Sequence, residues 1–419
     1  LMETIIKGVT ITDPNGPHDG TTKDVLVRDG VIVDIQDAIS SAPAATEWNE
    51  PGAHLSIGWM DLQADFADPG FEQKEGLENG LRAAQAGGFT HVVLNVNQHP
   101  VPDTKSNIAY LIARSAGLSA HLLPMGTVSK GRDGKQLSEM RDLAHAGAVA
   151  FSDDAPLNSV ELLRRALEYT HGLPHPVITC PLELGLNANP QMHEGITSTH
   201  MAVVGNPTAS ETMRIKRDLD VLRYTGGRLH FSCISSAESV SLIREAKKEG
   251  LAVTCATSAH HLFFVDEDLS AFDGTLKTVP PFRSTADREA LCAGVLDGTI
   301  DALASDHRPE DLEHHDVEFM LASNGMAGIE SVFPVALAGL GATPEAHSAI
   351  IQALTAGPRA VLGLDVPHIA VGAAANLTWY HPAQAGSETK VSAAENHPEY
   401  AGRTTEFTGR GAVLGTLLG

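Results

Sequence analysis

The stretch that decides the fold is residues 58–70, which read GWMDLQADFADPG. After a short apolar run, the polar residues Asp61, Gln63 and Asp65 fall on alternate positions, which is the period of a β-strand. Gln63 and Asp65 therefore point to the same side of the predicted strand. As the first strand of a parallel barrel, it would turn that side toward the interior near the C-terminal mouth, where barrel enzymes carry out their chemistry.

Strand and helix patterns alternate along the chain from this stretch onward. Predicted helices such as 77–86, 209–224 and 285–296 each lead into a short apolar strand, and a further strand is expected at 148–152. Roughly eight such units predict an α/β fold, a TIM (β/α)8 barrel, rather than an open sheet.

The two ends of the chain are rich in short strand patterns instead. Residues 1–52 include two strand-like segments that meet across Asp29-Gly30, a strong hairpin signal. Residues 370–419 contain similar segments. We expect both chain ends to build one small, β-sandwich-like domain, with the barrel occupying residues 53–369.

Composition narrows the classes of function. The chain of 419 residues has 29 basic against 52 acidic residues and a net charge of −23, which argues against nucleic acid as a partner. No run of about 18 apolar residues occurs, so we expect no membrane span. A signal-peptide pattern is absent and no C-x-x-C pair occurs, so we expect a cytoplasmic protein. The cysteines are scattered, at Cys180, Cys233, Cys255 and Cys292.

The opening stretch resembles the first-strand signature of the dihydroorotases and related cyclic amidohydrolases, which reads roughly G-x-x-D-x-H-x-H-x-R-x-P-G. The frame of that signature is present as Gly58, Asp61, Pro69 and Gly70. In the family the two histidines bind zinc, and the arginine grips the substrate carboxylate. Here the histidine positions hold Gln63 and Asp65, and the arginine position holds Ala67.

Two further segments resemble the family where later strands end. Residues 95–100 resemble the M-P-N-T-N-P turn, and Asn97 falls on the asparagine that contacts substrate. A turn asparagine that bonds its own backbone is the alternative. Residues 151–154 match F-[ST]-D-D, so the resemblance implies Asp153, or Asp154, as a ligand that bridges two metals. A helix N-cap is the alternative for one of the pair.

Other family ligand positions carry different residues. Residues 178–183 stand where the family has an A-H-C-E-D-like segment, but the ligand histidine is absent, and Cys180 or Pro181 takes its place. Residues 229–236 match H-x-x-H-[IV]-S-T, in which His230 keeps the first histidine, an expected substrate contact, while Cys233 replaces the second, a metal ligand. Cysteine can bind zinc, although packing alone also accounts for such a residue.

The last two segments concern the substrate and the catalytic base. Residues 277–283 match K-x-N-P-P-L-R, with Val279 in place of the asparagine that binds the pyrimidine ring. Residues 303–310 match [TS]-D-H-A-P-H. There Asp306 keeps the aspartate that takes the proton of the attacking water in the family, and Glu310 replaces the last histidine, which contacts substrate.

The reaction that the resemblance implies is metal-assisted hydrolysis of the cyclic amide C–N bond of dihydroorotate. A binuclear zinc site would need about four histidines, and none of the expected four is present. The family ligand positions hold Gln63, Asp65, Asp153, Cys233 and Asp306. This set predicts either no metal or a weakly bound hard divalent ion. Histidines elsewhere are expected at the solvated surface, namely His171, His175, His193, His200, His314 and His315.

Both halves of the site differ from the family, because Ala67, Val279 and Glu310 alter the substrate side as well. We therefore expect a catalytically impaired or inactive dihydroorotase homologue of pyrimidine biosynthesis. It would form a dimer or larger homo-oligomer and act as a scaffold for aspartate carbamoyltransferase. The alternative is an active cyclic amidohydrolase with a carboxylate-rich metal site. A third possibility is a small-molecule binding protein that uses Asn97, His230 and Glu310. The sequence leaves open whether the chain is an enzyme.

Overall fold

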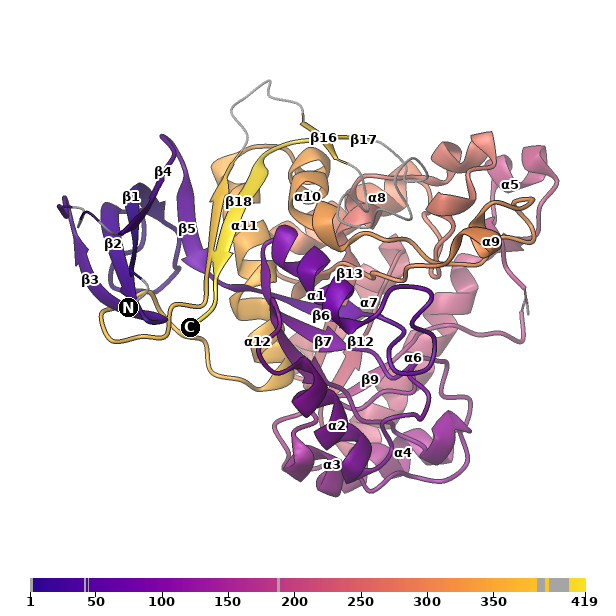
Figure 1. The fold of residues 1–419 in the computed structure, drawn as a ribbon. Coiled ribbons are helices and arrows are strands. Elements are labelled where there is room, and N and C mark those ends of the chain that lie inside the picture. The colour runs from indigo at the N-terminus through magenta and orange to yellow at the C-terminus, as the bar shows by residue number, and fades with distance from the viewer. Residues whose placement is uncertain (1–2, 41–42, 44, 187–188, 383–388, 392–406) are drawn as a thin grey trace.

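The computed structural model describes residues 3–40, 43, 45–186, 189–382, 389–391 and 407–419 (Figure 1). Parallel strands form a closed barrel surrounded by helices, so the predicted TIM barrel is confirmed. The named barrel strands are β6 (Trp59–Ala64), β7 (Phe89–Leu94), β8 (His121–Pro124), β9 (Val177–Thr179), β12 (Leu229–Phe231), β13 (Val253–Ser258) and β14 (Ala302–Ala304). They pair as β6-β7-β8 and as β9-β12-β13-β14.

Two short connections close the barrel between these groups of strands. Phe151 forms parallel bridges to Gly126 and Val177, and Ala64 forms one to His307 beside β14. The strand expected at 148–152 is therefore reduced to a bridge at Phe151. Pro124 and Pro176, which lie beside it on the two neighbouring segments, have no backbone N–H to donate, and this shortens the ladder.

The helices pack their apolar faces on the outside of the barrel. They are α1 (Leu77–Ala86), α2 (Lys105–Ser115), α3 (Met140–Ala146), α4 (Val160–Tyr169), α6 (Thr208–Thr225), α7 (Ala237–Lys248), α8 (Thr285–Leu296), α10 (Val332–Leu340), α11 (Pro344–Leu354) and α12 (Ala356–Leu362), with the short α5 (Ile196–Met201) and α9 (Leu312–His315). One core cluster joins strands to helices, and it includes Leu229 and Phe231. A second fills the barrel with residues such as Leu62, Ile178 and Ala256.

A separate sheet combines strands from both chain ends (Figure 1). Its strands are β1 (Glu3–Ile11), β2 (Thr22–Arg28), β3 (Val31–Gln36), β4 (Thr46–Asn49), β5 (His54–Ile57), β15 (Leu377–His381) and β18 (Ala412–Leu417). The order is β18-β15-β5-β1-β2-β3, with β4 paired to β1. Trp48 and Trp379 stack at 5.0 Å between ring centroids and tie the two chain ends together. The sheet includes β5 and so extends past residue 52.

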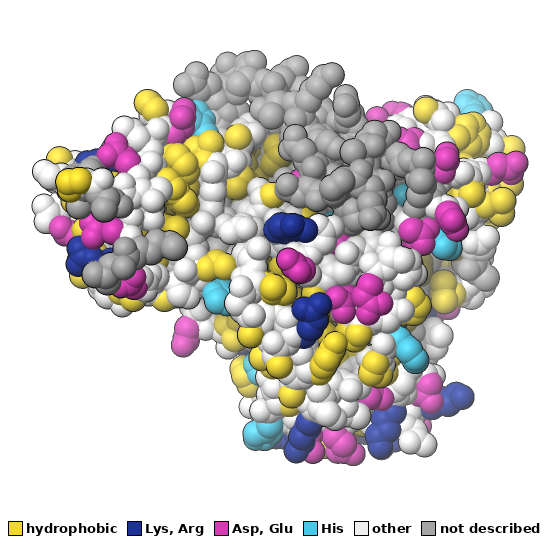
Figure 2. Space-filling model, in the orientation of Figure 1, with side chains coloured by type: hydrophobic (Ala, Val, Ile, Leu, Met, Phe, Trp, Pro, Cys, Tyr) yellow, Lys and Arg dark blue, Asp and Glu magenta, His cyan; other side chains and the backbone are white. Residues whose placement is uncertain are grey.

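Smaller strand pairs lie outside the barrel and this sheet. They are β10 (Met192–His193) with β11 (Gly205–Asn206), and β16 (Thr389–Val391) with β17 (Phe407–Gly409). Among the described residues, no helix is long and apolar enough to cross a membrane. Figure 2 shows acidic side chains scattered over the visible face rather than gathered in one place.

The contact between the small sheet and the barrel predicts a loss of stability in acid. The Nδ1 atom of His54 lies 2.9 Å from the Thr12 hydroxyl, and its ring meets that of His347 on α11 at 5.0 Å. Burial, with the nearby His347 and His381, lowers the pKa of His54 from 6.5 to about 4. Between these two pH values the unfolded chain binds a proton that the folded chain does not, so stability falls as the pH falls.

We therefore expect the wild-type melting temperature to drop more between pH 7 and pH 5 than that of a His54→Gln variant. The variant itself is less stable at pH 7, because it loses part of the packing against His347. The exposed His200 offers a matched control, and His200→Gln should follow the wild type. Equal pH slopes for the wild type and His54→Gln would contradict this assignment.

Candidate functional site

Asp306 lies directly beyond β14, at the C-terminal end of the barrel, and its carboxylate is held from two sides. Gln63 Nε2 donates to Asp306 Oδ1 at 2.8 Å, and Arg308 Nε donates to the same oxygen at 2.9 Å. Asp306 is 6% exposed. Burial raises the pKa of Asp306, while the Arg308 charge acts in the opposite direction. The residue in the position of the family's proton acceptor is thus fixed by two donors.

The guanidinium of Arg308 joins two carboxylates that come from different strands. Nη1 and Nη2 donate to the two carboxylate oxygens of Asp154 at 2.7 and 2.8 Å, while Nε binds Asp306. Burial alone would lower the pKa of Arg308, but Asp154 and Asp306 raise it well above its usual range. Burial would likewise raise the pKa of Asp154, but the Arg308 charge holds it below 3.8. Both partners in this fork are therefore charged.

Asn97 connects a third carboxylate to this group. Its Nδ2 donates to Asp65 Oδ2 at 2.9 Å and to Asp154 Oδ2 at 2.6 Å. Asp65 Oδ1 in turn accepts the backbone N–H of Ala67 at 2.9 Å. The side chain of Asn97 thus bridges two acids beyond the ends of their strands. We call the group of Gln63, Asp65, Asn97, Asp154, Asp306 and Arg308 the mouth cluster.

Three residues in or beside the mouth cluster adopt left-handed backbone conformations. Ala67, Asp154 and Asp306 have φ values of 57°, 45° and 47°. Non-glycine residues with positive φ are uncommon, and such strain is concentrated where a structure holds functional groups. The backbone at this end of the barrel is therefore held in a strained conformation by the contacts around it.

Asp153, which the resemblance offers together with Asp154 as a bridging ligand, turns away from the mouth cluster. Its Oδ1 accepts the backbone N–H groups of Val128 and Ser129 at 2.9 and 3.0 Å, and its Oδ2 accepts the Ser129 hydroxyl. The backbone turns at Asp154, which has a left-handed conformation, and its carboxylate faces the cluster instead. The N-cap alternative is wrong, since α4 begins after Ser159, whose own side chain caps it.

The two cysteines at family ligand positions are protonated thiols. Burial raises the pKa of Cys233 well above 9.0, and the Asp306 carboxylate adds to this effect. Burial also raises the pKa of Cys180 to about 12, again with a contribution from the nearby Asp154. The surroundings of both thiols therefore favour the neutral form.

The residues expected to contact substrate are dispersed. His230 lies within the barrel, where its Nδ1 is 2.8 Å from Thr254 Oγ1, and burial lowers its pKa to about 3. Glu310 is neutralised by Lys74, with 2.7 Å between Oε1 and Nζ. Ala67 is 4% exposed and Val279 is half-buried. Apart from the Ala67 N–H to Asp65, the hydrogen bonds of the described residues do not join these four to the mouth cluster.

The sequence analysis did not single out Arg308, although its position in the family motif marks it as unusual. The family motif D-H-A-P-H has alanine at the position of Arg308. The sequence also gave no sign of a supporting layer of contacts beside the mouth cluster. In this layer His307 Nε2 lies 2.6 Å from Glu75 Oε2. Asp61 accepts hydrogen bonds from both the backbone N–H and the hydroxyl of Ser305. Burial raises the pKa of Asp61 to about 6. This layer links β6 to the segment that carries Asp306.

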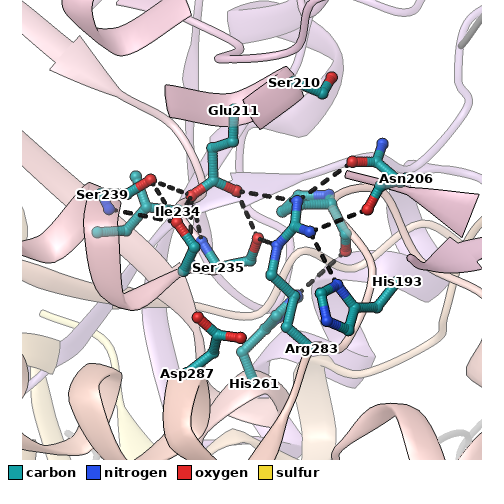
Figure 3. A network of polar contacts seen from close by, with 12 residues as sticks. His193, Asn206, Ser210, Glu211, Ile234, Ser235, Ser239, His261, Arg283 and Asp287 are labelled. Carbon is teal, nitrogen blue, oxygen red and sulfur yellow. Dashed lines mark hydrogen bonds and ion pairs between the residues drawn. The ribbon is translucent and has the colours of Figure 1, made fainter. Parts of the chain in front are cut away.

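A second buried network stabilises the other side of the barrel (Figure 3). Arg283 donates to the Ser235 hydroxyl at 2.7 Å and to the backbone carbonyl and side-chain oxygen of Asn206 at 3.1 and 3.2 Å. Its Nη1 also lies 3.1 Å from His193 Nδ1, so the expectation of a solvated His193 is wrong. Glu211, 3.7 Å from Arg283, accepts hydrogen bonds from the loop and helix after β12. These donors are Ser235, Ser236 and Ser239.

Removing the charge of Glu211 should destabilise the fold strongly. A Glu211→Gln variant leaves the Arg283 charge buried, and breaking such a pair costs about 3–5 kcal/mol. The exposed pair of Lys216 and Glu238 provides a control, because Glu238→Gln should cost less than about 1 kcal/mol. Urea unfolding of the three proteins measures both effects. Equal midpoints for Glu211→Gln and Glu238→Gln would show that the network does not have this role.

The residues at the mouth do not fit a tightly bound zinc ion. Among the residues that the structure describes, no group of three or more His, Cys, Asp or Glu side chains is arranged to hold a metal. The carboxylates of Asp65, Asp154 and Asp306 are already engaged by N–H donors. The cation between Asp154 and Asp306 is the guanidinium of Arg308.

Comparison with known proteins gives a consistent result. The model of a family described as Dihydro-orotase-like matches residues 53–239. A dihydroorotase from Geobacter sp. (strain M21) is 36% identical over 397 residues, covering 94% of this chain and 92% of the relative. A dihydroorotase from Anaeromyxobacter dehalogenans (strain 2CP-C) is 36% identical over 421 residues, covering 99% and 96%.

Solved structures resemble the chain in fold. The L-hydantoinase (dihydropyrimidinase) from Arthrobacter aurescens superimposes with a TM-score of 0.83 at 20% identity, covering 100% of this chain and 95% of the other. A dihydropyrimidinase from Brevibacillus agri NCHU1002 gives a TM-score of 0.77 at 18% identity, covering 98% and 93%. At these identities the likeness concerns the architecture alone.

Proposed function

Because this chain belongs to the dihydroorotase family, we propose that it serves pyrimidine biosynthesis without hydrolysing dihydroorotate, as a scaffold for aspartate carbamoyltransferase. The observation that carries the loss of hydrolysis is the Arg308 fork between Asp154 and Asp306. The scaffold role is supported because the barrel of the family is intact while the residues of its site are altered.

Hydrolysis of a cyclic amide needs an activated water and a free base. In the family mechanism a metal lowers the pKa of water, and an aspartate takes its proton. Here Gln63 and Arg308 both donate hydrogen bonds to Oδ1 of Asp306, so this oxygen is already engaged by two N–H groups. A carboxylate tied to these two donors is less available to take a proton from water, and this supports the absence of turnover.

The substrate side supports the same proposal. Ala67 replaces the arginine that grips the substrate carboxylate, and each charge-assisted hydrogen bond of that kind contributes about 1.5–3 kcal/mol. Val279 has no side-chain donor or acceptor for a pyrimidine ring. Glu310 adds a carboxylate, held by Lys74, where the family has a histidine. A dihydroorotate molecule would lose its main polar contacts at these positions.

The loss of hydrolysis can be tested on protein purified without a histidine tag. Elemental analysis should find no stoichiometric metal, and dihydroorotate should not be turned over before or after addition of zinc, manganese or magnesium. A dihydroorotase from Geobacter sp. (strain M21) serves as the control in the same assay. One or two metals per chain together with turnover would overturn the proposal and favour the carboxylate-rich enzyme, with Asp65, Asp154 and Asp306 as the ligands to mutate.

The scaffold role predicts a direct association. Mixed with aspartate carbamoyltransferase from the same organism, the chain should co-migrate in size-exclusion chromatography as a larger complex of fixed stoichiometry. The run is repeated at high salt, because the net charge of −23 can cause unspecific association that salt screens. Two separate peaks under both conditions would contradict the scaffold role and leave the test of hydrolysis unaffected.

A further inference from the structure

We propose that Arg308 is an internal cation that takes the electrostatic place of a divalent metal at the barrel mouth. Removing its side chain should open a site for a hard divalent cation between the carboxylates of Asp154 and Asp306, with water molecules as its other ligands. The inference rests on the proposed function only in requiring that the wild-type chain binds no metal there. It names Arg308 as the group that keeps a metal from binding. It also predicts that the chain binds a divalent ion once the Arg308 side chain is removed.

The charges of the mouth cluster require a cation. Asp154 and Asp306 have side chains that are 7% and 6% exposed, and both bind the same guanidinium, at 2.7 and 2.9 Å. Asp65 joins them through Asn97, whose amide is neutral. Buried carboxylates that repel one another keep their charge only when a positive group neutralises them. Among the described residues that bond to these carboxylates, Arg308 supplies that charge.

The geometry of Arg308 suits a bridging role. Three of its N–H groups bind two acids that follow different barrel strands, the short segment at Phe151 and β14. A guanidinium presents donors in a fixed plane, so it can hold both carboxylates in one geometry as a metal ion would. A lysine ammonium is a point charge on a flexible stem and lacks this fork. The position therefore requires arginine and not merely positive charge.

The location of Arg308 explains why a metal is excluded from the chain as it stands. The motif resemblance places alanine at this position in the family, where a methyl group would leave the space between the acids free. In this chain the guanidinium fills that space. Oxygen ligands from carboxylates are those that Mg²⁺ and Mn²⁺ prefer. An Arg308→Ala variant would thus combine free space, oxygen donors and unbalanced negative charge.

The test is thermal melting of Arg308→Ala with and without Mn²⁺ or Mg²⁺, at constant ionic strength. We expect a lower melting temperature than the wild type without divalent ions. The temperature should then rise with the logarithm of the Mn²⁺ concentration, as linkage requires for a ligand of the folded state. Isothermal titration with Mn²⁺ should give binding to the variant and none to the wild type. If the variant folds only when Mn²⁺ is present, the proposal is equally supported.

Two further variants make the result specific. Lys74→Ala removes the cation of the neighbouring Lys74–Glu310 pair, and it should lose stability without gaining any response to Mn²⁺. The triple variant Arg308→Ala, Asp154→Asn, Asp306→Asn removes the acids as well, and it should be more stable than Arg308→Ala and insensitive to Mn²⁺. An Arg308→Ala protein that ignores Mn²⁺ and Mg²⁺, or that responds no more than Lys74→Ala, would overturn the proposal.

These outcomes are separate from those of the proposed function. Turnover of dihydroorotate by the wild type would refute the loss of hydrolysis, whatever Arg308→Ala binds. A failure of Arg308→Ala to bind divalent ions would refute the internal cation and leave the inactivity of the wild type in place.

Discussion

The structure of the barrel mouth depends on one guanidinium held between two buried carboxylates. Arg308 neutralises Asp154 and Asp306 and binds both through its guanidinium N–H groups, at distances of 2.7 to 2.9 Å. Both acids sit on strained, left-handed backbone positions, which persist only where the surroundings hold them. The positive charge that balances these two carboxylates therefore comes from a side chain of the same protein.

The remaining polar networks show how the fold stays rigid. The Asp61–Ser305 contact and the His307–Glu75 pair hold β6, the segment before α1 and the segment after β14 together just outside the mouth cluster. On the other side, the Arg283–Glu211 network fixes the loop after β12 (Figure 3). Each network consists of side chains that satisfy one another within the barrel. The architecture therefore does not depend on the donors that the family uses to bind zinc.

The sequence predicted the barrel and the family, because hydrophobic periodicity and ordered motifs are local signals that accumulate along the chain. Both expectations are confirmed. The site was harder to predict. The choice between Asp153 and Asp154 depends on how the backbone turns where these residues lie. Asp154 has a left-handed conformation with a φ of 45°, and a sequence pattern gives no sign of it. Arg308 stood in a matched motif, but its partners are 154 and 2 residues away, and only the fold shows that it reaches both. The contact between His193 and Arg283 likewise joins residues far apart in the sequence, so only the tertiary structure reveals it.

The central claim is that a guanidinium stands where a metal would be needed. Anomalous diffraction from wild-type crystals soaked in zinc and in manganese tests it most directly. The account predicts no anomalous peak between Asp154 and Asp306 and the Arg308 fork in place in both soaks. A peak between these carboxylates, with Arg308 displaced from them, would contradict the account and return the site to metal chemistry.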